Sequence, residues 1–94
     1  MTADQSDSAA RTATAAEILH AVGGAANVVG LTRCWSRLRF VLVDRDLADL
    51  EALGALETVA VVAPQQGELQ VALSRGLVET FDAVVVLLTS SAGG

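Results

Sequence analysis

Apolar residues recur at helical spacing near the start of the chain. The apolar residues within 18–22 come shortly after Thr14 and Glu17. These two residues have the spacing of a capping box, in which the two side chains bond free backbone groups at the start of a helix. Gly23 and Gly24 come next, and glycine readily takes the left-handed conformation that ends a helix. The pattern therefore predicts a first helix that begins at Thr14 and ends at the glycine pair.

Two later stretches also predict helices. In the first, leucines repeat every third residue, at Leu47, Leu50, Leu53 and Leu56. Asp46 is placed to cap this short second helix, and Gly54 to end or kink it. In the other stretch, apolar residues share one helical face at Val78, Phe81, Val84, Val85 and Leu88. The β-branched run 84–86 also favours a strand, but the helical spacing favours a terminal helix.

Alternation and turn residues predict the strands. Over residues 35–43, odd-numbered positions carry Trp35 and the arginines, and even-numbered positions carry leucines and Phe40. This alternation predicts a strand. The β-prone runs Val59–Ala63 and Glu68–Leu73 lie on either side of the turn-rich segment Pro64–Gly67. These two runs are therefore predicted to form a hairpin.

The two ends of the chain lack any such pattern. Residues 1–13 are small and polar, and residues 90–94 are rich in serine and glycine, so we expect a disordered N-terminal tail and a flexible C-terminal tail. The 94 residues, 52% hydrophobic and 18% charged, suffice for one compact domain. We place this domain at residues 14–89, with an aliphatic core.

Composition argues against several classes of function. The formal net charge of −5 argues against a nucleic-acid partner, which needs a basic face. Apolar runs such as Ala83–Leu88 fall short of the ~20 residues that span a bilayer, and the N-terminus does not read as a secretory signal, so we expect a cytoplasmic protein. One cysteine cannot form an internal disulfide, and His20 is the sole histidine, so we expect no metal and no cofactor.

The candidate chemistry gathers around Cys34. Arginines precede and follow this cysteine, and their positive charge favours the reactive thiolate. Arg37 and Arg39 share strand parity, so both project to one face, about 7 Å apart, where their planar forks could hold an anion such as phosphate. The hydroxyls of Thr32 and Ser36 could donate to the same anion.

Other interpretations of these residues stay open. Cys34 could be a small buried hydrophobe, with the arginines paired to the many acidic residues. An activated thiol could also serve as a redox sensor, although the chain has no second, resolving cysteine. His20 is interpreted as a helix-surface residue rather than a catalytic base, because it lies far from Cys34 in the sequence.

Three segments together resemble a known family. Gly23–Val29, Leu31–Phe40 and Gln66–Val71 are similar to the IIB domain of the glucose/β-glucoside class of the bacterial phosphoenolpyruvate-dependent sugar phosphotransferase system. The most specific part is a Cys-x-Ser-Arg-Leu-Arg run beginning at Cys34, after a Gly-Gly-x-x-Asn loop. On this resemblance, residues 14–89 are interpreted as a phosphotransferase system EIIB type-1-like domain.

The resemblance implies both a fold and a function. The fold is α+β, a four-stranded antiparallel sheet with helices packed on one face, which requires a short strand within residues 28–33. The function is that of a phosphoryl carrier: Cys34 accepts phosphate from a phosphohistidine of a IIA protein and passes it to a sugar bound by the IIC membrane permease. Arg37 and Arg39 take the role of handling the phosphoryl group. The domain would then act in the cytoplasm, at the inner face of the cell membrane through IIC.

The sequence also departs from the family. Ser36 replaces the usual threonine, Trp35 replaces a small or aliphatic residue, and Ser74 stands where glycine is common, with Gly76 two residues on. Trp35 motivates an alternative function, a non-transferring regulatory module that keeps the fold. We expect Trp35 and Arg33 to form part of a IIA docking surface, since aromatic and arginine residues anchor interfaces. In the other interpretation, Trp35 turns inward and fills the aliphatic core.

Overall fold

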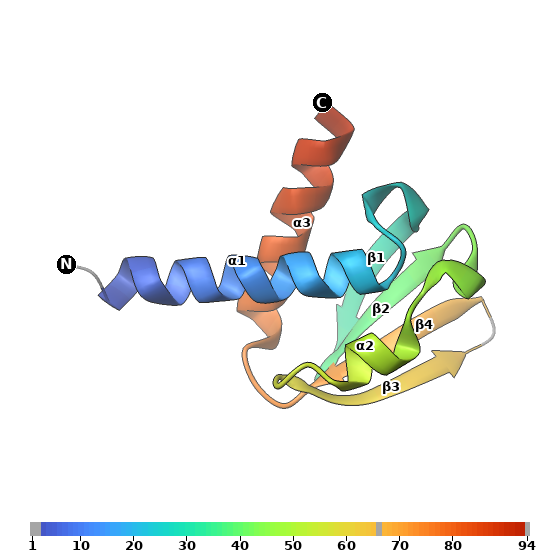
Figure 1. The fold of residues 1–94 in the computed structure, drawn as a ribbon, viewed down its shortest axis with the longest axis horizontal. Helices are drawn as coiled ribbons and strands as arrows, with labels where there is room; N and C mark the ends of the chain where they lie inside the picture. The colour runs from blue at the N-terminus through green and yellow to red at the C-terminus, as the bar shows by residue number, and fades with distance from the viewer. Residues whose placement is uncertain (1–2, 66, 94) are drawn as a thin grey trace.

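The computed structural model describes residues 3–65 and 67–93, and it contains one antiparallel sheet of four strands (Figure 1). The strands are β1 (Val28–Cys34), β2 (Arg37–Leu42), β3 (Val59–Gln65) and β4 (Glu68–Leu73). Their order across the sheet is β1-β2-β4-β3, so β2 and β4 are the central pair. The short strand required over residues 28–33 is therefore confirmed, and so is the hairpin over residues 59–73.

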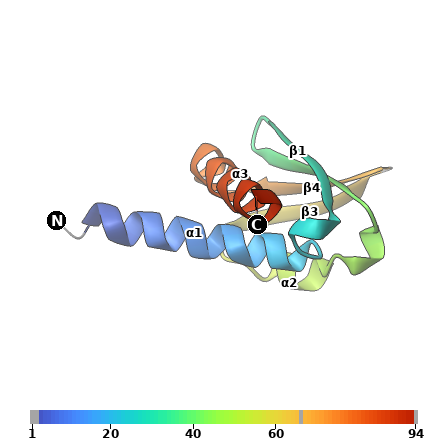
Figure 2. The ribbon, with the colours of Figure 1, turned by 90° about the horizontal axis from the view of Figure 1, so that it is seen from above.

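The helices enclose a single hydrophobic core against the sheet. They are α1 (Ala3–Ala21), α2 (Leu50–Gly54) and α3 (Leu77–Gly93), with one-turn 3-10 helices at Ala25–Asn27 and Arg45–Leu47. Figure 2 shows α1 and α2 on the same side of the sheet, with α3 beside α1. The predicted class, α+β with a four-stranded antiparallel sheet and helices on one face, is confirmed.

Strand alternation decides which side chains enter this core. In β2, Leu38 and Phe40 are fully buried, whereas Arg37 and Val41 are exposed on the opposite face. The central strand β4 buries Leu69, Val71 and Leu73 in the same way, and the helices add Ile18, Val22, Leu53 and Val84. Each large apolar side chain removed from water stabilises the fold by about 1.5–3 kcal/mol. The other, open face of the sheet carries polar side chains alongside exposed apolar ones such as Val41 and Val61.

The first helix is longer than predicted. It begins at Ala3, so Thr14 lies inside it and the predicted capping box is wrong. Alanines are frequent between Ala3 and Ala21 and no glycine or proline interrupts them, which gives this stretch a high helix propensity. The predicted end is confirmed: Gly23 and Gly24 follow with φ of 106° and 91°.

The predicted tails overlap with both terminal helices. Residues 3–13 belong to α1 and residues 90–93 to α3, while Met1, Thr2 and Gly94 lie outside the described residues. The terminal helix itself is confirmed, although its buried face centres on Val84. Val78 and Val85 of the predicted face are exposed, and Leu87 lies against the core instead.

The leucine repeat does not form one continuous helix. Two separate turns replace it, and the cap is not Asp46: the side chain of Asp44 accepts from the Asp46 N–H at 2.9 Å, and that of Asp49 accepts from the Ala52 N–H at 3.0 Å. Each turn starts at an aspartate that can satisfy its free N–H groups. Gly54 ends α2 as predicted, and Leu53 is the leucine that this helix buries fully.

The Gly-Gly-x-x-Asn loop forms a buried junction. Asn27, only 3% exposed, donates from Nδ2 to the carbonyls of Val22 at 2.8 Å and Asp44 at 2.9 Å. Its Oδ1 accepts from the Asp44 N–H at 2.9 Å. A side chain at Gly23 would place its Cβ 2.6 Å from Asn27 Nδ2, so the glycine leaves space for the asparagine. This junction ties the end of α1 to the end of β2.

Candidate functional site

The turn between β1 and β2 carries Cys34. The predicted strand over residues 35–43 begins later than expected, because Trp35 and Ser36 form the turn and β2 starts at Arg37. Cys34 is thus the last residue of β1 rather than the entry to a strand. A two-residue connection of this kind is the tightest common link between antiparallel strands.

Strand register brings the predicted site residues together on the open face of the sheet. Cys34 lies directly across from Arg37, and Thr32 lies directly across from Arg39. Side chains of such cross-strand pairs share a face, with Cβ atoms about 4.5–5.5 Å apart. The prediction that Arg37 and Arg39 project to one face is confirmed, because the alternating residues Leu38 and Phe40 are buried on the other.

Trp35 occupies the turn with an unusual backbone conformation. Its φ is 59°, the left-handed region, in which a non-glycine residue costs about 1–2 kcal/mol. The indole is 93% exposed, so the interpretation that Trp35 fills the core is wrong. The Ser36 carbonyl accepts from the Leu73 N–H at 2.8 Å, which fastens the turn to β4.

Two residues of β4 hold the arginines in a polar network. Arg37 donates from Nη1 to Gln70 Oε1 at 2.8 Å. Arg39 donates two hydrogen bonds to Glu68, from Nε to Oε1 at 3.0 Å and from Nη2 to Oε2 at 3.3 Å. Gln70 Nε2 also donates to Glu68 Oε1 at 2.8 Å and closes the network. The hydrogen bonds from Gln70 and Arg39 hold the pKa of the Glu68 carboxyl below its usual value.

A polar hollow of about 510 Å³ opens beside the cysteine. Its lining consists of Cys34, Trp35, Ser36, Arg37, Arg39 and Gln70. Cys34 is exposed, so the interpretation of a buried, inert cysteine is wrong. The hollow is open enough, and cationic enough, to receive an anion at the cysteine sulfur. Thr32 lies on the same strand face, two residues before Cys34, but it does not line the hollow.

Arg33 lies apart from this cluster. Its cross-strand partner is the buried Leu38, which places the Arg33 side chain on the helix-covered face of the sheet. The guanidinium carbon lies over the ring of Phe81 in α3, 5.4 Å from the ring centroid, a cation–π contact. The arginine is exposed at the rim of the sheet, but it does not face the hollow beside Cys34.

Glu68 and Gln70 were missed as site residues by the sequence interpretation. The signal available for them is their parity, since both alternate with the apolar Leu69 and Val71 along a predicted strand. That parity puts them on the polar face of a sheet, but only the pairing of β4 with β2 puts them beside the arginines.

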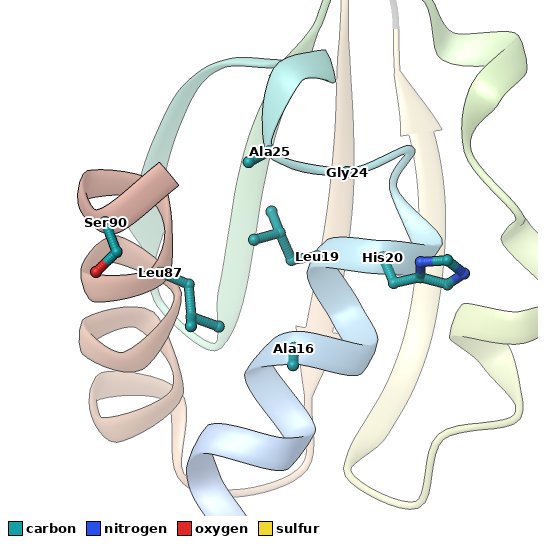
Figure 3. A pocket seen from close by; sticks show the side chains of 7 residues that line it. All are labelled: Ala16, Leu19, His20, Gly24, Ala25, Leu87 and Ser90. Carbon is teal, nitrogen blue, oxygen red and sulfur yellow. The ribbon is translucent and has the colours of Figure 1, made fainter. Parts of the chain in front are cut away.

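An apolar hollow of about 430 Å³ lies between α1 and α3 (Figure 3). Leu19 and Leu87 project into it, whereas His20 lies at its edge and points away from Leu87. His20 is exposed on α1, which confirms its interpretation as a helix-surface residue. Among the described residues, no three His, Cys, Asp or Glu side chains gather as metal ligands would. No helix within residues 3–65 and 67–93 combines the length and hydropathy that crossing a membrane requires.

Comparison with known proteins finds matches among components of the phosphotransferase system (PTS). The family model described as "phosphotransferase system, EIIB" matches residues 16–49. The trehalose-specific EIIBC component of Bacillus subtilis is 38% identical over 72 residues, which are 77% of this chain and 15% of that protein. The sucrose-specific EIIBC component of Staphylococcus xylosus is 42% identical over 64 residues, 68% of this chain and 13% of that protein. The chain thus spans about one seventh of the length of these relatives.

A solved structure agrees with the sequence matches. The crystal structure of one domain of the PTS system IIabc component from Clostridium difficile superposes with a TM-score of 0.72 and 26% sequence identity. The superposition covers 83% of this chain and 81% of that one. The chain is therefore, in sequence and in fold, an EIIB domain of the glucose/β-glucoside class of the sugar phosphotransferase system.

Proposed function

We propose that this domain is a phosphoryl carrier, with Cys34 as the residue that is phosphorylated. The observation that carries the proposal is the cross-strand pairing of an exposed Cys34 with Arg37, beside a polar hollow that Arg39 and Gln70 also line. A phosphoryl group adds a charge of about −1.5 to −2, which needs cationic partners. The guanidinium groups of Arg37 and Arg39, on the same face of the sheet as Cys34, would be these cationic partners.

The transfer would proceed in two displacements at phosphorus. The Cys34 thiolate attacks the phosphorus of a IIA phosphohistidine, so that an S–P bond forms and the N–P bond breaks. The electron pair returns to the imidazole nitrogen, which takes up a proton, while the thiol proton has gone to solvent. A sugar hydroxyl oxygen then attacks the same phosphorus, the S–P bond breaks, the thiolate leaves and the hydroxyl proton is lost to solvent.

The remaining site residues serve this chemistry as donors. Arg37 and Arg39 would contact the phosphoryl oxygens and offset the charge that spreads over them during transfer. The Ser36 hydroxyl lines the same hollow and can donate to the group. Thr32, outside the hollow but on the same strand face, would act as a further donor only if the phosphoryl group extends toward Arg39.

The partners follow from the two displacements. A IIA protein would supply the phosphohistidine, and a IIC membrane permease would hold the sugar, which puts the domain in the cytoplasm at the inner face of the membrane. The relatives' designation as EIIBC components supports the IIC partner, since it joins a B and a C part in one protein. The trehalose and sucrose named for those relatives are both sugars.

Docking of the IIA protein would involve Trp35 and Arg33. An indole that is 93% exposed beside the reacting sulfur is available to a partner that must approach Cys34. Arg33 lies exposed on the other side of the same strand end. Since Trp35 is the only tryptophan, its emission reports on docking: we expect red-shifted fluorescence that moves to the blue when IIA is added. If the emission of Trp35 does not change when IIA is added, Trp35 is not part of the docking surface.

Incubation with a phosphorylated IIA donor tests the function. We expect intact-mass analysis to show one added phosphoryl group, acid-stable and iodine-labile, on the wild-type domain and none on Cys34→Ser, because a hydroxyl without a base is a far weaker nucleophile. Cys34 is exposed, so the serine variant should keep its melting temperature. A serine variant that still accepts and passes on phosphate contradicts the proposal, and a wild-type domain that stays unphosphorylated favours the regulatory module instead.

A further inference from the structure

The two arginines of the site have different partners. Arg37, across the ladder from Cys34, bonds to the neutral amide of Gln70, so no neighbouring carboxylate offsets its charge among the described contacts. Arg39 instead commits Nε and Nη2 to the carboxylate of Glu68. The guanidinium that lies farther along the strand from Cys34 is therefore already occupied by an anion of the protein.

Glu68 is held firmly in this position. Its side chain is 19% exposed, and its Oε1 accepts from Arg39 and also from Gln70. Those bonds lower the pKa of the carboxyl, so it is ionised at neutral pH. The pair formed by Glu57 and Arg75 shows the contrast: it has one bond of 3.1 Å, and the Glu57 side chain is 88% exposed. A two-bonded, partly buried arginine–carboxylate pair is the kind that persists in solution.

We propose that Glu68 is a positioning residue that competes with the phosphoryl group on Cys34 for the guanidinium of Arg39. This inference rests on the proposed function of the site. Without phosphate, Glu68 holds the Arg39 guanidinium toward β4 and accepts a hydrogen bond from Gln70. Gln70 in turn accepts a hydrogen bond from Arg37. When Cys34 carries phosphate, Arg37 is the nearer cation, and Arg39 turns its Nε–Nη2 edge to the group only by loosening its bonds to Glu68.

The competition has a defined consequence for transfer. Cys34 and Arg39 are diagonal neighbours across the β1–β2 ladder. Such residues lie roughly 7–8 Å apart, a span that the Arg39 side chain can bridge. The Nε–H and Nη2–H groups that hold Glu68 cannot bond a phosphate at the same time, so while that pair lasts Arg39 offers the phosphoryl group only its remaining N–H groups and a partly neutralised charge. Glu68 therefore weakens the hold of the site on the phosphoryl group and leaves it easier to pass on.

Anion binding to the unphosphorylated domain tests this directly. Inorganic phosphate is titrated at neutral pH into the wild type, Glu68→Gln and Glu57→Gln, and the arginine Nε–H signals are followed by NMR. We expect Glu68→Gln to bind phosphate about tenfold more tightly, since a charge-assisted bond no longer competes, and the Arg39 signal to move with the titration. Glu57→Gln makes the same change in net charge elsewhere and should match the wild type.

A second variant separates charge from side-chain shape. Glu68→Asp keeps the negative charge, so its phosphate affinity should stay near that of the wild type. Equal phosphate affinities of Glu68→Gln and Glu57→Gln overturn the proposal. So does a phosphate affinity of Glu68→Asp that is as high as that of Glu68→Gln. Because the titration needs no donor protein, it fails or succeeds independently of the phosphorylation of Cys34.

The transfer reaction supplies a further readout. With a phosphorylated IIA donor, Glu68→Gln should pass the phosphoryl group onward several-fold more slowly than the wild type, because Arg39 then retains it. An onward rate equal to that of the wild type contradicts the proposal. Absence of phosphate on Cys34 in every variant contradicts the proposed function alone.

Discussion

The two halves of the family motif form opposite kinds of polar structure. The junction at Asn27 is buried, and the asparagine bonds backbone groups on two segments, at Val22 and Asp44. The site at Cys34 is exposed, and its hydrogen bonds run between side chains, from Arg37 and Arg39 to Gln70 and Glu68.

This difference separates stability from chemistry. The Val22 carbonyl bonds the Asn27 amide in a buried contact, where water does not readily replace a lost partner, so the junction should tolerate little change. Side chains on an open face can exchange one partner for another at small cost, as a site that must bind and release an anion requires. Substitutions at the junction should therefore act on folding, and substitutions at the site on transfer.

Asn27→Ala should give the largest effect on stability. It removes a buried partner from the Val22 carbonyl and part-buried partners from the N–H and the carbonyl of Asp44, although that carbonyl keeps the Leu47 N–H at 3.2 Å. We expect the free energy of unfolding to fall by about 3 kcal/mol. The melting temperature should fall by more than about 10 °C, measured by circular dichroism. Gln65→Ala, an exposed position, serves as the control and should change little. If Asn27→Ala and Gln65→Ala have equal melting temperatures, the Asn27 junction does not stabilise the fold.

Gly23→Ala should come next, and Gly24→Ala is its matched control. Both glycines have positive φ, and Gly24, at a ψ of 168°, lies in a region almost confined to glycine, so alanine is strained at either position by at least about 1 kcal/mol. Only at Gly23 would the new Cβ meet Asn27 Nδ2 at 2.6 Å; at Gly24 nothing lies within 4 Å. We expect Gly23→Ala to lose about 2 kcal/mol and Gly24→Ala about half of that, measured by urea unfolding. A larger loss at Gly24 contradicts the packing argument.

Arg37→Lys tests the chemical half of the comparison. Lysine keeps the charge but not the planar fork, so onward phosphoryl transfer should slow by about tenfold, whereas the melting temperature should stay nearly unchanged. Arg39→Lys should slow transfer less, because Arg37 lies directly across from Cys34. Arg75→Lys, at an exposed ion pair, is the control. Unchanged transfer in both site variants would leave the arginines without a role in it.

Trp35→Asn should produce the smallest change, and one of opposite sign. Asparagine tolerates the left-handed region that Trp35 occupies at a φ of 59°, and an indole that is 93% exposed loses no packing when removed. We expect a gain of about 0.5 kcal/mol in the free energy of unfolding. Trp35→Val, which is β-branched, should lower it instead. If both variants shift stability in the same direction, backbone strain at the turn is not the cause.

Local patterns in the sequence were sufficient for much of the fold. The alternation of Leu38 and Phe40 with Arg37 and Arg39 determined which face of β2 is buried, because side chains of a strand alternate wherever it pairs. The glycine pair determined the end of α1, because the conformation it adopts is local. Cys34, Arg37 and Arg39 were identified for the same reason: they lie close together in the sequence.

Contacts between distant segments were decided only by the tertiary structure. The alternation over residues 35–43 runs unbroken through the turn, so it could not show that Trp35 and Ser36 lie outside β2. Glu68 and Gln70 are about thirty residues from the arginines that they bond, and nothing near them in the sequence specifies that β4 pairs with β2. Register between strands depends on how whole faces pack against the core, so the residues around Cys34 became a site only when the sheet was assembled.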